Sequence, residues 1–402
     1  MHISFYFIAM GKNIAVGIDI GTYHVKVVVG ERVKNGERYA PHILGTGYAE
    51  SKGIHHGYII NANDAVRSIS QAVAQAEKAS GIKIKKAYLG VGGVSVESVT
   101  ANGKAVISRA DSQITDIDVE AALEDSEQNL PGALSQNRRI LHTIPLQYRI
   151  DGKDVLGNRP IGMKGTRLEV KTLFILCLEQ HLHDLITAIE TAGIEVEDVM
   201  ASPIAASLVT LSKTQKIAGC LLANIGAETV SMVVFENNVP ISLQIFPIGS
   251  TAITNDIALG LKIPLEEAEQ VKLGTLAASV PKKKLEEIIV ARLSDIFELI
   301  EAHLKKIGRD GLLPAGIVIT GGGSGITTVE ELAKASLRLP SKIGSLYLAP
   351  NGGKGHVIDS TWSVAYGLVI WGFTAREEKS LSNQLFQSTK KSLVQWIKQF
   401  LP

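Results

Sequence analysis

The sequence predicts an α/β protein made of two related lobes that face a cleft. A strand, a tight glycine turn and a return strand occur at residues 14–29, and the same order recurs at residues 219–235. A third glycine turn, at residues 320–325, follows an apolar strand and precedes a helical pattern. Because repetition of one supersecondary unit indicates duplicated substructures, we expect two lobes whose glycine turns meet across the cleft.

Composition places the chain among globular proteins. Its 402 residues suffice for two or more domains, with 45% hydrophobic residues, 20% charged residues and a formal net charge of +1. This charge gives no general attraction to nucleic acid, so no partner of that kind is expected. Cys177 and Cys220 lie in apolar strand-like runs, which favours a reducing compartment over a disulfide framework. Residues 1–13 are interpreted as a ragged start, with Met10 a candidate initiator.

Periodicity and end signals place the main helices. Apolar positions at helical spacing predict a helix at residues 63–80, which ends at Gly81. The texture changes over residues 87–176, where three strand-like runs surround one acidic helix at residues 117–129. This stretch is predicted to form a small α+β insert. A helix-rich block is expected at residues 251–308.

The glycine turns have the chemistry of a phosphate site. Phosphate oxygens need closely spaced N–H donors, and glycine lets a backbone approach them without a Cβ in the way. The first turn offers donors at Gly21 and Thr22 and a carboxylate at Asp19 that can hold Mg²⁺ through water. The third turn suits an adenine base or its phosphates. A plain hairpin for the first turn and a glycine-rich connector for the third are the open alternatives.

Several segments carry a family resemblance: "DIGT" at Asp19, "NIGAET" at Asn224, "PIAASLVTL", "RRILHTIPLQYRIDG", "FPIGSTAITNDIALGLKIPLEEAEQVKLG", "GIVITGGGSGI" and "WSVAYGL". They resemble the actin, Hsp70 and sugar-kinase superfamily and, within it, the FtsA family of bacterial division proteins, over about residues 14–372. The resemblance implies an actin-like ATPase fold, in which two lobes of duplicated ribonuclease H-like subdomains surround a nucleotide cleft. It also implies an FtsA-type α+β insert domain of the SHS2 kind.

The resemblance further implies subdomain boundaries. The main subdomain of the first lobe is expected at residues 14–86, 171–205 and 359–376, the insert at 87–170, the main subdomain of the second lobe at 206–250 and 311–358, its helical subdomain at 251–310, and a linker at 377–388.

ATP and Mg²⁺ are the cofactors that the resemblance implies. By position, Asp19 would face the metal through water, and Gly21 and Thr22 would donate to the phosphates. The other residues expected at the nucleotide are Asn224, Gly226, Thr229, Glu269, Lys272, Gly321, Gly322 and Gly323. Glu269 and Lys272 would hold the ribose side, and an isolated surface salt bridge one helical turn long is the competing interpretation.

The second turn departs from the family pattern Asp-Ile-Gly-Gly-Gly-Thr. Asn224 replaces the aspartate, Ala227 the second glycine and Glu228 the third. Asn224 can order a water or a metal but cannot act as a base. Glu228 would bring an anion near the γ-phosphate unless it points away or meets Mg²⁺. We therefore predict that ATP binds and is hydrolysed slowly or not at all, and no catalytic residue is assigned.

A basic amphipathic helix is predicted at residues 389–402. Its apolar positions share one stripe, and lysines and glutamines cover the other side. At 1.5 Å per residue it would span about 20 Å, which is too short to cross a bilayer. Reversible binding to an anionic membrane surface is favoured over docking on the protein's own core, and FtsA proteins end in such a helix. The residues expected at the membrane are Lys390, Lys391, Leu393, Val394, Trp396, Ile397, Lys398, Phe400 and Leu401.

The resemblance implies a role in cell division at the cytoplasmic face of the cell membrane, at the division site. FtsA proteins form actin-like filaments and tether filaments of FtsZ, and other division proteins are further expected partners. The acidic FtsZ tail would bind the second lobe, where Arg292 is our candidate for a carboxylate contact. Pairing of Arg292 with Asp295 or Glu298 on its own helix is the alternative. A PilM-like pilus-assembly adaptor and a sugar or acid kinase are the competing functions.

Overall fold

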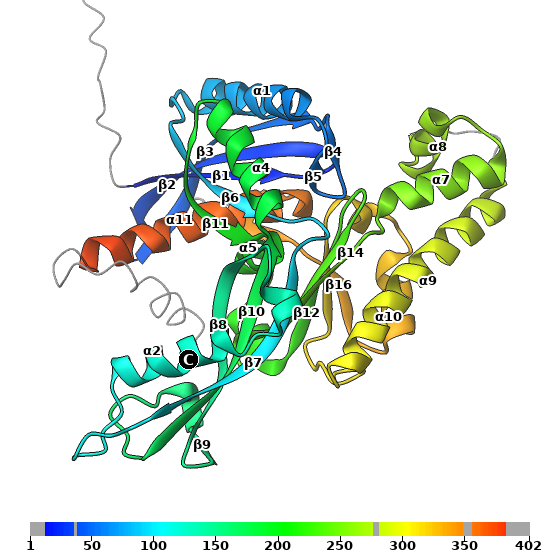
Figure 1. The fold of residues 1–402 in the computed structure, drawn as a ribbon. Helices are drawn as coiled ribbons and strands as arrows, with labels where there is room; N and C mark the ends of the chain where they lie inside the picture. The colour runs from blue at the N-terminus through cyan, green and yellow to red at the C-terminus, as the bar shows by residue number, and fades with distance from the viewer. Residues whose placement is uncertain (1–12, 36–37, 276–280, 349–355, 383–402) are drawn as a thin grey trace, which may run out of the picture.

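The structure is a computed structural model that describes residues 13–35, 38–275, 281–348 and 356–382. The elements of the first lobe are β1 (Ile14–Ile20), β2 (His24–Asn35), β3 (Arg38–Glu50), β4 (Ile54–His55), β5 (Tyr58–Ile59), α1 (Ala62–Ser80), β6 (Lys86–Val91), α4 (Glu179–Thr191), β11 (Glu195–Ala201), α5 (Ser202–Thr210) and α11 (Ser363–Ser382). The main sheet has the order β11-β6-β1-β2-β3 (Figure 1). Strand β1 runs antiparallel to β2 and parallel to β6.

The second lobe repeats this arrangement. Its elements are α6 (Lys213–Ala218), β12 (Cys220–Ile225), β13 (Val230–Glu236), β14 (Val239–Phe246), β15 (Ile317–Thr320), α10 (Val329–Leu337), β16 (Ser341–Ile343), β17 (Leu346–Leu348) and β18 (His356–Ile358). The main sheet has the order β14-β13-β12-β15-β16, with β12 antiparallel to β13 and parallel to β15. The predicted duplication is confirmed, because each sheet places a β-hairpin beside a parallel strand in the same order.

Helices α5 and α11 join the lobes and pack against each other. A side chain at Gly367 on α11 would meet the carbonyl oxygen of Ala205 on α5. On the other side of α11, a side chain at Gly17 would meet the carbonyl oxygen of Ala365. Glycine at these two positions therefore lets α11 lie close to both α5 and strand β1. One continuous apolar core includes these elements and extends to strands of the second lobe.

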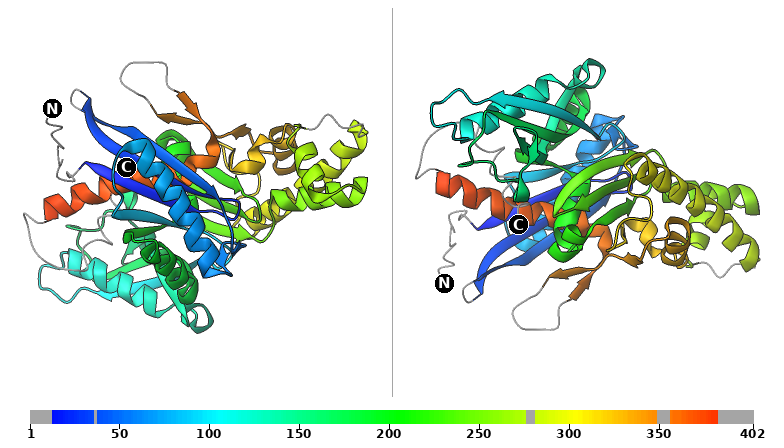
Figure 2. Two further views of the ribbon diagram at one scale, coloured as in Figure 1. Left: turned by 90° about the horizontal axis from the view of Figure 1, so that it is seen from above. Right: turned by 90° about the horizontal axis from the view of Figure 1, so that it is seen from below.

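The insert is a four-stranded sheet with a helix on one face. Its elements are β7 (Glu97–Val106), α2 (Asp116–Gln128), α3 (Gly132–Ser135), β8 (Arg138–Ile150), β9 (Lys153–Asp154) and β10 (Arg167–Leu178), in the sheet order β7-β10-β8-β9. It projects from one side of the first lobe (Figure 2).

The expected insert boundaries are wrong at both ends. The first of the three strand-like runs, which starts at residue 87, divides at Gly93, whose φ is +86°. The part before the bend is β6, which pairs with β1 and β11 in the first sheet. The expected end at residue 170 falls inside β10, which continues to Leu178. Two strands of similar composition thus belong to different sheets because a glycine bend separates them.

The helical subdomain of the second lobe comprises α7 (Ser250–Leu261), α8 (Leu265–Lys272) and α9 (Lys282–Lys306). It lies at the end of the second lobe away from the insert (Figure 1). Buried apolar side chains from all three helices join the core beneath the second sheet. The expected helix-rich block at residues 251–308 is confirmed.

The predicted linker at residues 377–388 is helical in its first part, because α11 continues to Ser382. Its residues Glu377, Glu378 and Lys379 are good helix formers although their polarity suggested a spacer. The predicted membrane helix at residues 389–402 lies outside the described residues. Among the described helices, none has the length and apolarity needed to span a membrane.

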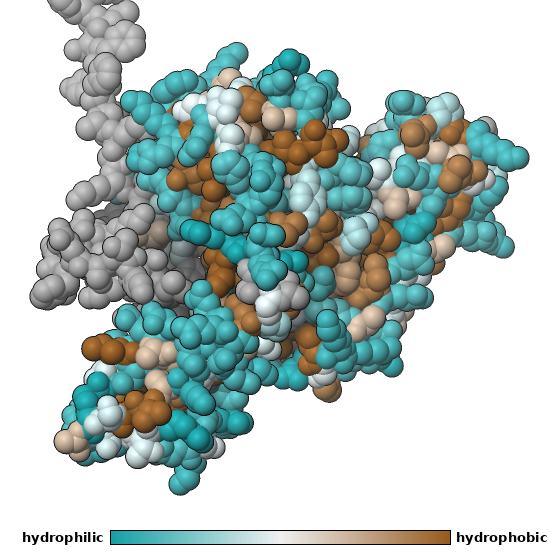
Figure 3. Space-filling model, viewed as in Figure 1, coloured by the Kyte–Doolittle hydropathy of each residue, from teal (hydrophilic) through white to brown (hydrophobic). Residues whose placement is uncertain are grey.

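Apolar residues gather at the far end of the insert on the face seen in Figure 3. The large apolar side chains of the insert that are exposed are Val106, Ile117, Leu156, Ile161 and Met163. Clustered exposed apolar residues are typical of contact surfaces with other macromolecules.

Candidate functional site

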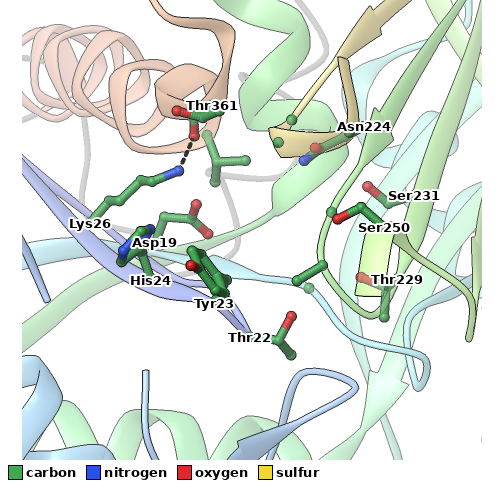
Figure 4. A pocket seen from close by; sticks show the side chains of 18 of the residues that line it. Asp19, Thr22, Tyr23, His24, Lys26, Asn224, Thr229, Ser231, Ser250 and Thr361 are labelled. Carbon is green, nitrogen blue, oxygen red and sulfur yellow. Dashed lines mark hydrogen bonds between the residues drawn. The ribbon is translucent and has the colours of Figure 1, made fainter. Parts of the chain in front are cut away.

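One cavity of about 510 Å³ lies where the two lobes meet, and all eleven residues predicted at a nucleotide line it. They are Asp19, Gly21, Thr22, Asn224, Gly226, Thr229, Glu269, Lys272, Gly321, Gly322 and Gly323. Figure 4 shows Asp19 and Thr22 from the first lobe facing Asn224 and Thr229 from the second. Residues up to about 300 positions apart in the chain thus share one cleft.

The first turn (residues 19–22) and the second turn (residues 224–229) have the same backbone construction. The N–H of Gly21 donates to the carbonyl oxygen of His24 at 3.2 Å, and that of Gly226 donates to the carbonyl oxygen of Thr229 at 2.9 Å. A Cβ on either glycine would lie 2.9 Å from the same carbonyl oxygen. Both turns therefore need glycine for a tight return, and both bring backbone to the cavity without a side chain in the way.

The first lobe supplies a half-buried carboxylate, Asp19, and a half-buried ammonium, Lys26. Asp19 and Lys26 are directly opposite in the β1–β2 ladder. Burial raises the pKa of Asp19 to about 6, while the Lys26 ammonium opposes this shift. Burial also lowers the pKa of Lys26, against the Asp19 and Asp359 carboxylates. The Lys26 Nζ donates to the carbonyl oxygen of Thr361 at 2.6 Å (Figure 4) and lies 5.7 Å from the centre of the Trp362 ring.

The third turn packs tightly against the second. Gly321 has a φ of +85°, and a Cβ there would collide with the Oδ1 of Asn224. Residues Gly322–Gly325 form a short 3₁₀ turn, and α10 begins only at Val329. The glycine turn lies at the cavity as expected, and the helix expected after it begins only beyond this 3₁₀ turn.

Glu269 and Lys272 form the predicted pair inside the cavity rather than as an isolated surface bridge. The Lys272 Nζ lies 2.7 Å from the Glu269 Oε2, and the Lys272 side chain is only 7% exposed. The hydroxyl of Thr254 donates to Glu269 at 2.6 Å and accepts from Lys272 at 2.8 Å. Lys272 also donates to the carbonyl oxygen of Ser250 at 3.3 Å. Helices α7 and α8 thus hold both charged side chains in fixed positions.

The Glu228 carboxylate points away from the cavity. Its Oε2 accepts from the backbone N–H of His56 at 2.6 Å, and its Oε1 lies 3.1 Å from the Nδ1 of His55. Both histidines belong to the β4–β5 turn of the first lobe. Of the three possibilities that the sequence left open, the structure has the one in which Glu228 points away from the cavity.

Arg292 is engaged within the second lobe. Its Nε and Nη2 donate to the two carboxylate oxygens of Asp256 at 2.6 and 3.0 Å, and its Nη1 lies 3.1 Å from Asp295. The alternative of pairing with Asp295 is confirmed, and Asp256 on α7 is a further partner that helix spacing alone did not indicate.

Sequence reasoning missed several residues that line the cavity. They include Tyr23, His24, Lys26, Tyr48, Ser231, Ser250, Thr361 and Trp362. Lys26 was detectable, because it stands on the polar side of an alternating strand that returns from the first turn. Tyr48 and Trp362 come from β3 and from the segment before α11, and only the tertiary fold brings them to the cleft. Within the described ranges no cluster of three or more His, Cys, Asp or Glu could hold a metal.

The fold is shared with solved proteins of low sequence identity. A chain of the PilM–PilN type IV pilus biogenesis complex aligns with a TM-score of 0.65 at 16% identity, covering 89% of this chain and 98% of that one. MreB5 of Spiroplasma citri bound to ADP aligns with a TM-score of 0.52 at 12% identity, covering 92% and 98%. Matched hairpins around an inter-lobe cavity, together with these likenesses, define an actin-like ATPase fold.

Sequence comparison gives the family. The family model described as cell division protein FtsA matches residues 221–367, and that of the SHS2 domain inserted in FtsA matches residues 93–176. The cell division protein FtsA of Pseudomonas aeruginosa is 30% identical over 390 residues, which cover 92% of this chain and 91% of the relative. The chain belongs to the FtsA family of cell division proteins. The predicted resemblance and the SHS2 insert are thereby confirmed.

The cavity has the chemistry that a nucleoside polyphosphate with Mg²⁺ requires. The backbone of both glycine turns lines it, but the N–H groups of Gly21 and Gly226, which were expected to donate to phosphates, are bonded within their turns to the carbonyl oxygens of His24 and Thr229. A bound Mg²⁺ would face Asp19 through water, and Lys26 stands opposite Asp19 in the β1–β2 ladder. The Gly321 to Gly323 backbone and the Glu269–Lys272 pair also line the cavity, where they would lie at the base and at the ribose of a nucleotide.

Proposed function

We propose that this member of the FtsA family binds Mg-ATP in the cleft, assembles into filaments and tethers FtsZ filaments to the cytoplasmic membrane at the division site. The observation that carries the nucleotide part is the meeting of all eleven predicted residues in one cavity. The membrane part rests on the amphipathic pattern of residues 389–402.

Hydrolysis in this cleft is proposed to be slow or absent. Activation of a water for attack on the γ-phosphate needs a positioned base or orienting group. In the second turn Asn224 is neutral, and the Glu228 carboxylate is bonded to the opposite lobe. The Glu269 carboxylate is paired with the Lys272 ammonium and accepts a hydrogen bond from the Thr254 hydroxyl. ATP in this site would therefore act mainly as a ligand that joins the lobes.

Filament formation and partner binding are proposed to use surfaces away from the cleft. The exposed apolar residues at the far end of the insert support contact with a second copy of the chain. The helical subdomain is proposed to take the acidic FtsZ tail, and any contact at Arg292 must exchange with Asp256.

The FtsZ contact is tested by fluorescence anisotropy of a labelled FtsZ tail peptide. If Arg292 binds the tail, Arg292→Ala weakens binding about tenfold, and Asp256→Asn tightens it by freeing the guanidinium. Equal affinities for the parent and both variants would exclude Arg292 as the contact.

The membrane tether is tested by co-sedimentation with anionic liposomes, with and without Mg-ATP. The full chain is expected to pellet, and Trp396→Glu to stay in solution, because it places a charge on the apolar stripe. Gln399→Glu makes the same change of charge on the polar side and is expected to retain most binding. If the parent stays soluble in every condition, the tethering role is excluded.

The same experiment separates the competing functions. A PilM-like adaptor has the more similar solved fold of the two compared, but it is not expected to carry a terminal membrane helix. Membership of the FtsA family favours division over this adaptor role and over a sugar or acid kinase.

A further inference from the structure

The two lobes are joined beside the cleft by a contact of three residues, His55 and His56 of the first lobe and Glu228 of the second. We call these three residues the clasp. The Glu228 Oε2 accepts from the His56 N–H at 2.6 Å, and its Oε1 lies 3.1 Å from the His55 Nδ1. The Nδ1 of His56 in turn lies 3.1 Å from the carbonyl oxygen of Glu228. One glutamate is thus held by its carboxylate and by its backbone.

The side of the clasp in the first lobe is rigid. His56 has a φ of +48°, which is unusual for a residue with a side chain and persists only where surrounding contacts determine it. The carbonyl oxygen of His56 accepts from the N–H of Val94 at 3.3 Å. The next residue, Gly57, leaves no room for a Cβ because Gly93 packs against it. The β4–β5 turn therefore presents its N–H to Glu228 in one fixed direction.

The side of the clasp in the second lobe is the second turn itself. Glu228 stands between Gly226 and Thr229, which both line the cavity. The first residues of α7 donate to this turn, from the N–H of Ser250 to the carbonyl oxygen of Gly226 at 2.9 Å and from that of Thr251 to Ala227 at 2.8 Å. The second turn is consequently held from one side by α7 and from the other by the first lobe.

The contacts of Glu228 connect the second turn, which lines the cavity, to the first lobe. The lobes cannot separate at the front of the cleft without breaking the bonds of Glu228. A carboxylate with backbone N–H and imidazole partners is also kept away from phosphate oxygens, which explains how the second turn tolerates glutamate. Removal of these bonds would free the second turn on the side that faces the first lobe.

We propose that Glu228 is a positioning residue for bound nucleotide, which keeps the second turn in its binding conformation and slows release by holding the lobes together. This inference rests on the proposed nucleotide function. It assigns a role to the residue at which this chain departs from the glycine of the family pattern.

The test is stopped-flow release of the fluorescent analogue mant-ATP from the full chain with Mg²⁺. Glu228→Ala is expected to speed release about tenfold, since it removes two contacts of a charged side chain. Glu228→Gln keeps an acceptor for the His56 N–H and is expected to stay within about threefold of the parent. His55→Ala removes one contact, and its release rate should lie between those of Glu228→Ala and Glu228→Gln.

Glu236→Ala is the matched control. Glu236 ends strand β13 of the same hairpin, and its carboxylate pairs with Arg309 at 2.7 Å, within the second lobe. Its removal is expected to leave the release rate unchanged. Melting temperatures of all variants, measured without nucleotide, should stay within a few degrees of the parent. A positioning role thus changes release without a matching loss of stability.

Amide hydrogen exchange over residues 53–58 gives an independent measurement. The His56 N–H should exchange faster in Glu228→Ala than in the parent or in Glu236→Ala. If the parent binds mant-ATP and all variants release it at the parental rate, the positioning role is overturned while the nucleotide site stands. If the parent does not bind mant-ATP, the proposed nucleotide function fails, and this inference fails with it.

Discussion

The two hairpin turns of the cleft share one backbone design and differ in charge. Each tight return depends on a glycine, Gly21 in the first and Gly226 in the second, with the same clearance to a carbonyl oxygen. The first lobe adds the opposite charges of Asp19 and Lys26, whereas the second offers the neutral Asn224. The two hairpins thus share the glycine and the hydrogen bond that closes each turn, while the side chains on them differ in charge.

The largest expected effect tests a steric demand at the cavity that the two lobes do not share. The parallel registers align Asp19 with Gly90 and Asn224 with Thr320, so Gly321 of the second lobe corresponds to Val91 of the first. Gly321→Ala is expected to destabilise the protein by about 3 kcal/mol or more, because a positive φ and a collision with Asn224 combine. Urea unfolding measures this change.

Gly322→Ala is the control for that substitution. No atom lies within 4 Å of its Cβ position, so its free energy of unfolding should change by less than about 1 kcal/mol. Similar losses for the two variants would contradict the steric account of the third turn.

The second prediction compares Asp19 of the first turn with Asn224 of the second turn. Asp19→Asn is expected to weaken Mg-ATP binding about 100-fold, since interactions with a charged group contribute roughly 1.5–3 kcal/mol. Asn224→Ala should weaken it less than about tenfold, because it removes only neutral hydrogen bonds. Calorimetric titration provides both affinities. With EDTA present, the difference in ATP affinity between Asp19→Asn and Asn224→Ala should become smaller. An unchanged difference in affinity would argue against a metal at Asp19.

The third effect concerns the junction of the first lobe with its insert. The backbone N–H of Ala201 on β11 donates to the His142 Nε2 on β8 at 3.0 Å, and burial lowers the pKa of His142 to about 3. A folded pKa below the ordinary 6.5 means that the unfolded chain takes up the proton first. Stability from this group is therefore present above pH 6.5 and is lost as the pH falls toward 3, at about 1.4 kcal/mol per pH unit.

His142→Gln carries no titrating group at this position. Its free energy of unfolding should fall less steeply than that of the parent between pH 6 and pH 4, by about 1.4 kcal/mol per pH unit. Parallel pH profiles for the two proteins would show that His142 is not the source of the acid sensitivity.

The smallest expected effect concerns Glu269 and Lys272, the charged pair of the second lobe that lines the cavity. Thr254→Val removes the hydroxyl that joins Glu269 to Lys272. ATP affinity is expected to fall about fivefold, as for the loss of one or two hydrogen bonds. Thr254→Ser keeps the hydroxyl and should bind like the parent, so equal losses in both variants would exclude the bonding explanation.

Much of the fold followed from local pattern. Strand β1, helix α1 and the glycine turns obey short-range rules of alternation and capping, and these were predicted closely. Strand β3 was missed, and β2 was expected to end at Val29, because charged residues interrupt the apolar run. Pairing along the whole β2–β3 ladder sustains both strands beyond that point.

The sequence predicted the parts of the candidate site that depend on backbone turns. It did not predict the direction in which particular side chains point. Glycine spacing and the family resemblance indicated all eleven residues at the cavity. The direction of the Glu228 carboxylate depends on a histidine turn about 170 residues earlier in the chain. The partner of Arg292 on α7 is likewise set by helix packing. Neither contact leaves a periodic signal in the sequence.

The most direct measurement exchanges the two polar residues between the turns. Mg-ATP affinity is determined by calorimetry for the parent, for Asp19→Asn, and for Asp19→Asn combined with Asn224→Asp. If the charge needed at the phosphate end belongs to the first lobe, the parent binds Mg-ATP and the exchanged protein binds no more tightly than Asp19→Asn alone. Parental affinity in the exchanged protein would contradict this asymmetry, and no binding by the parent would contradict the nucleotide site itself.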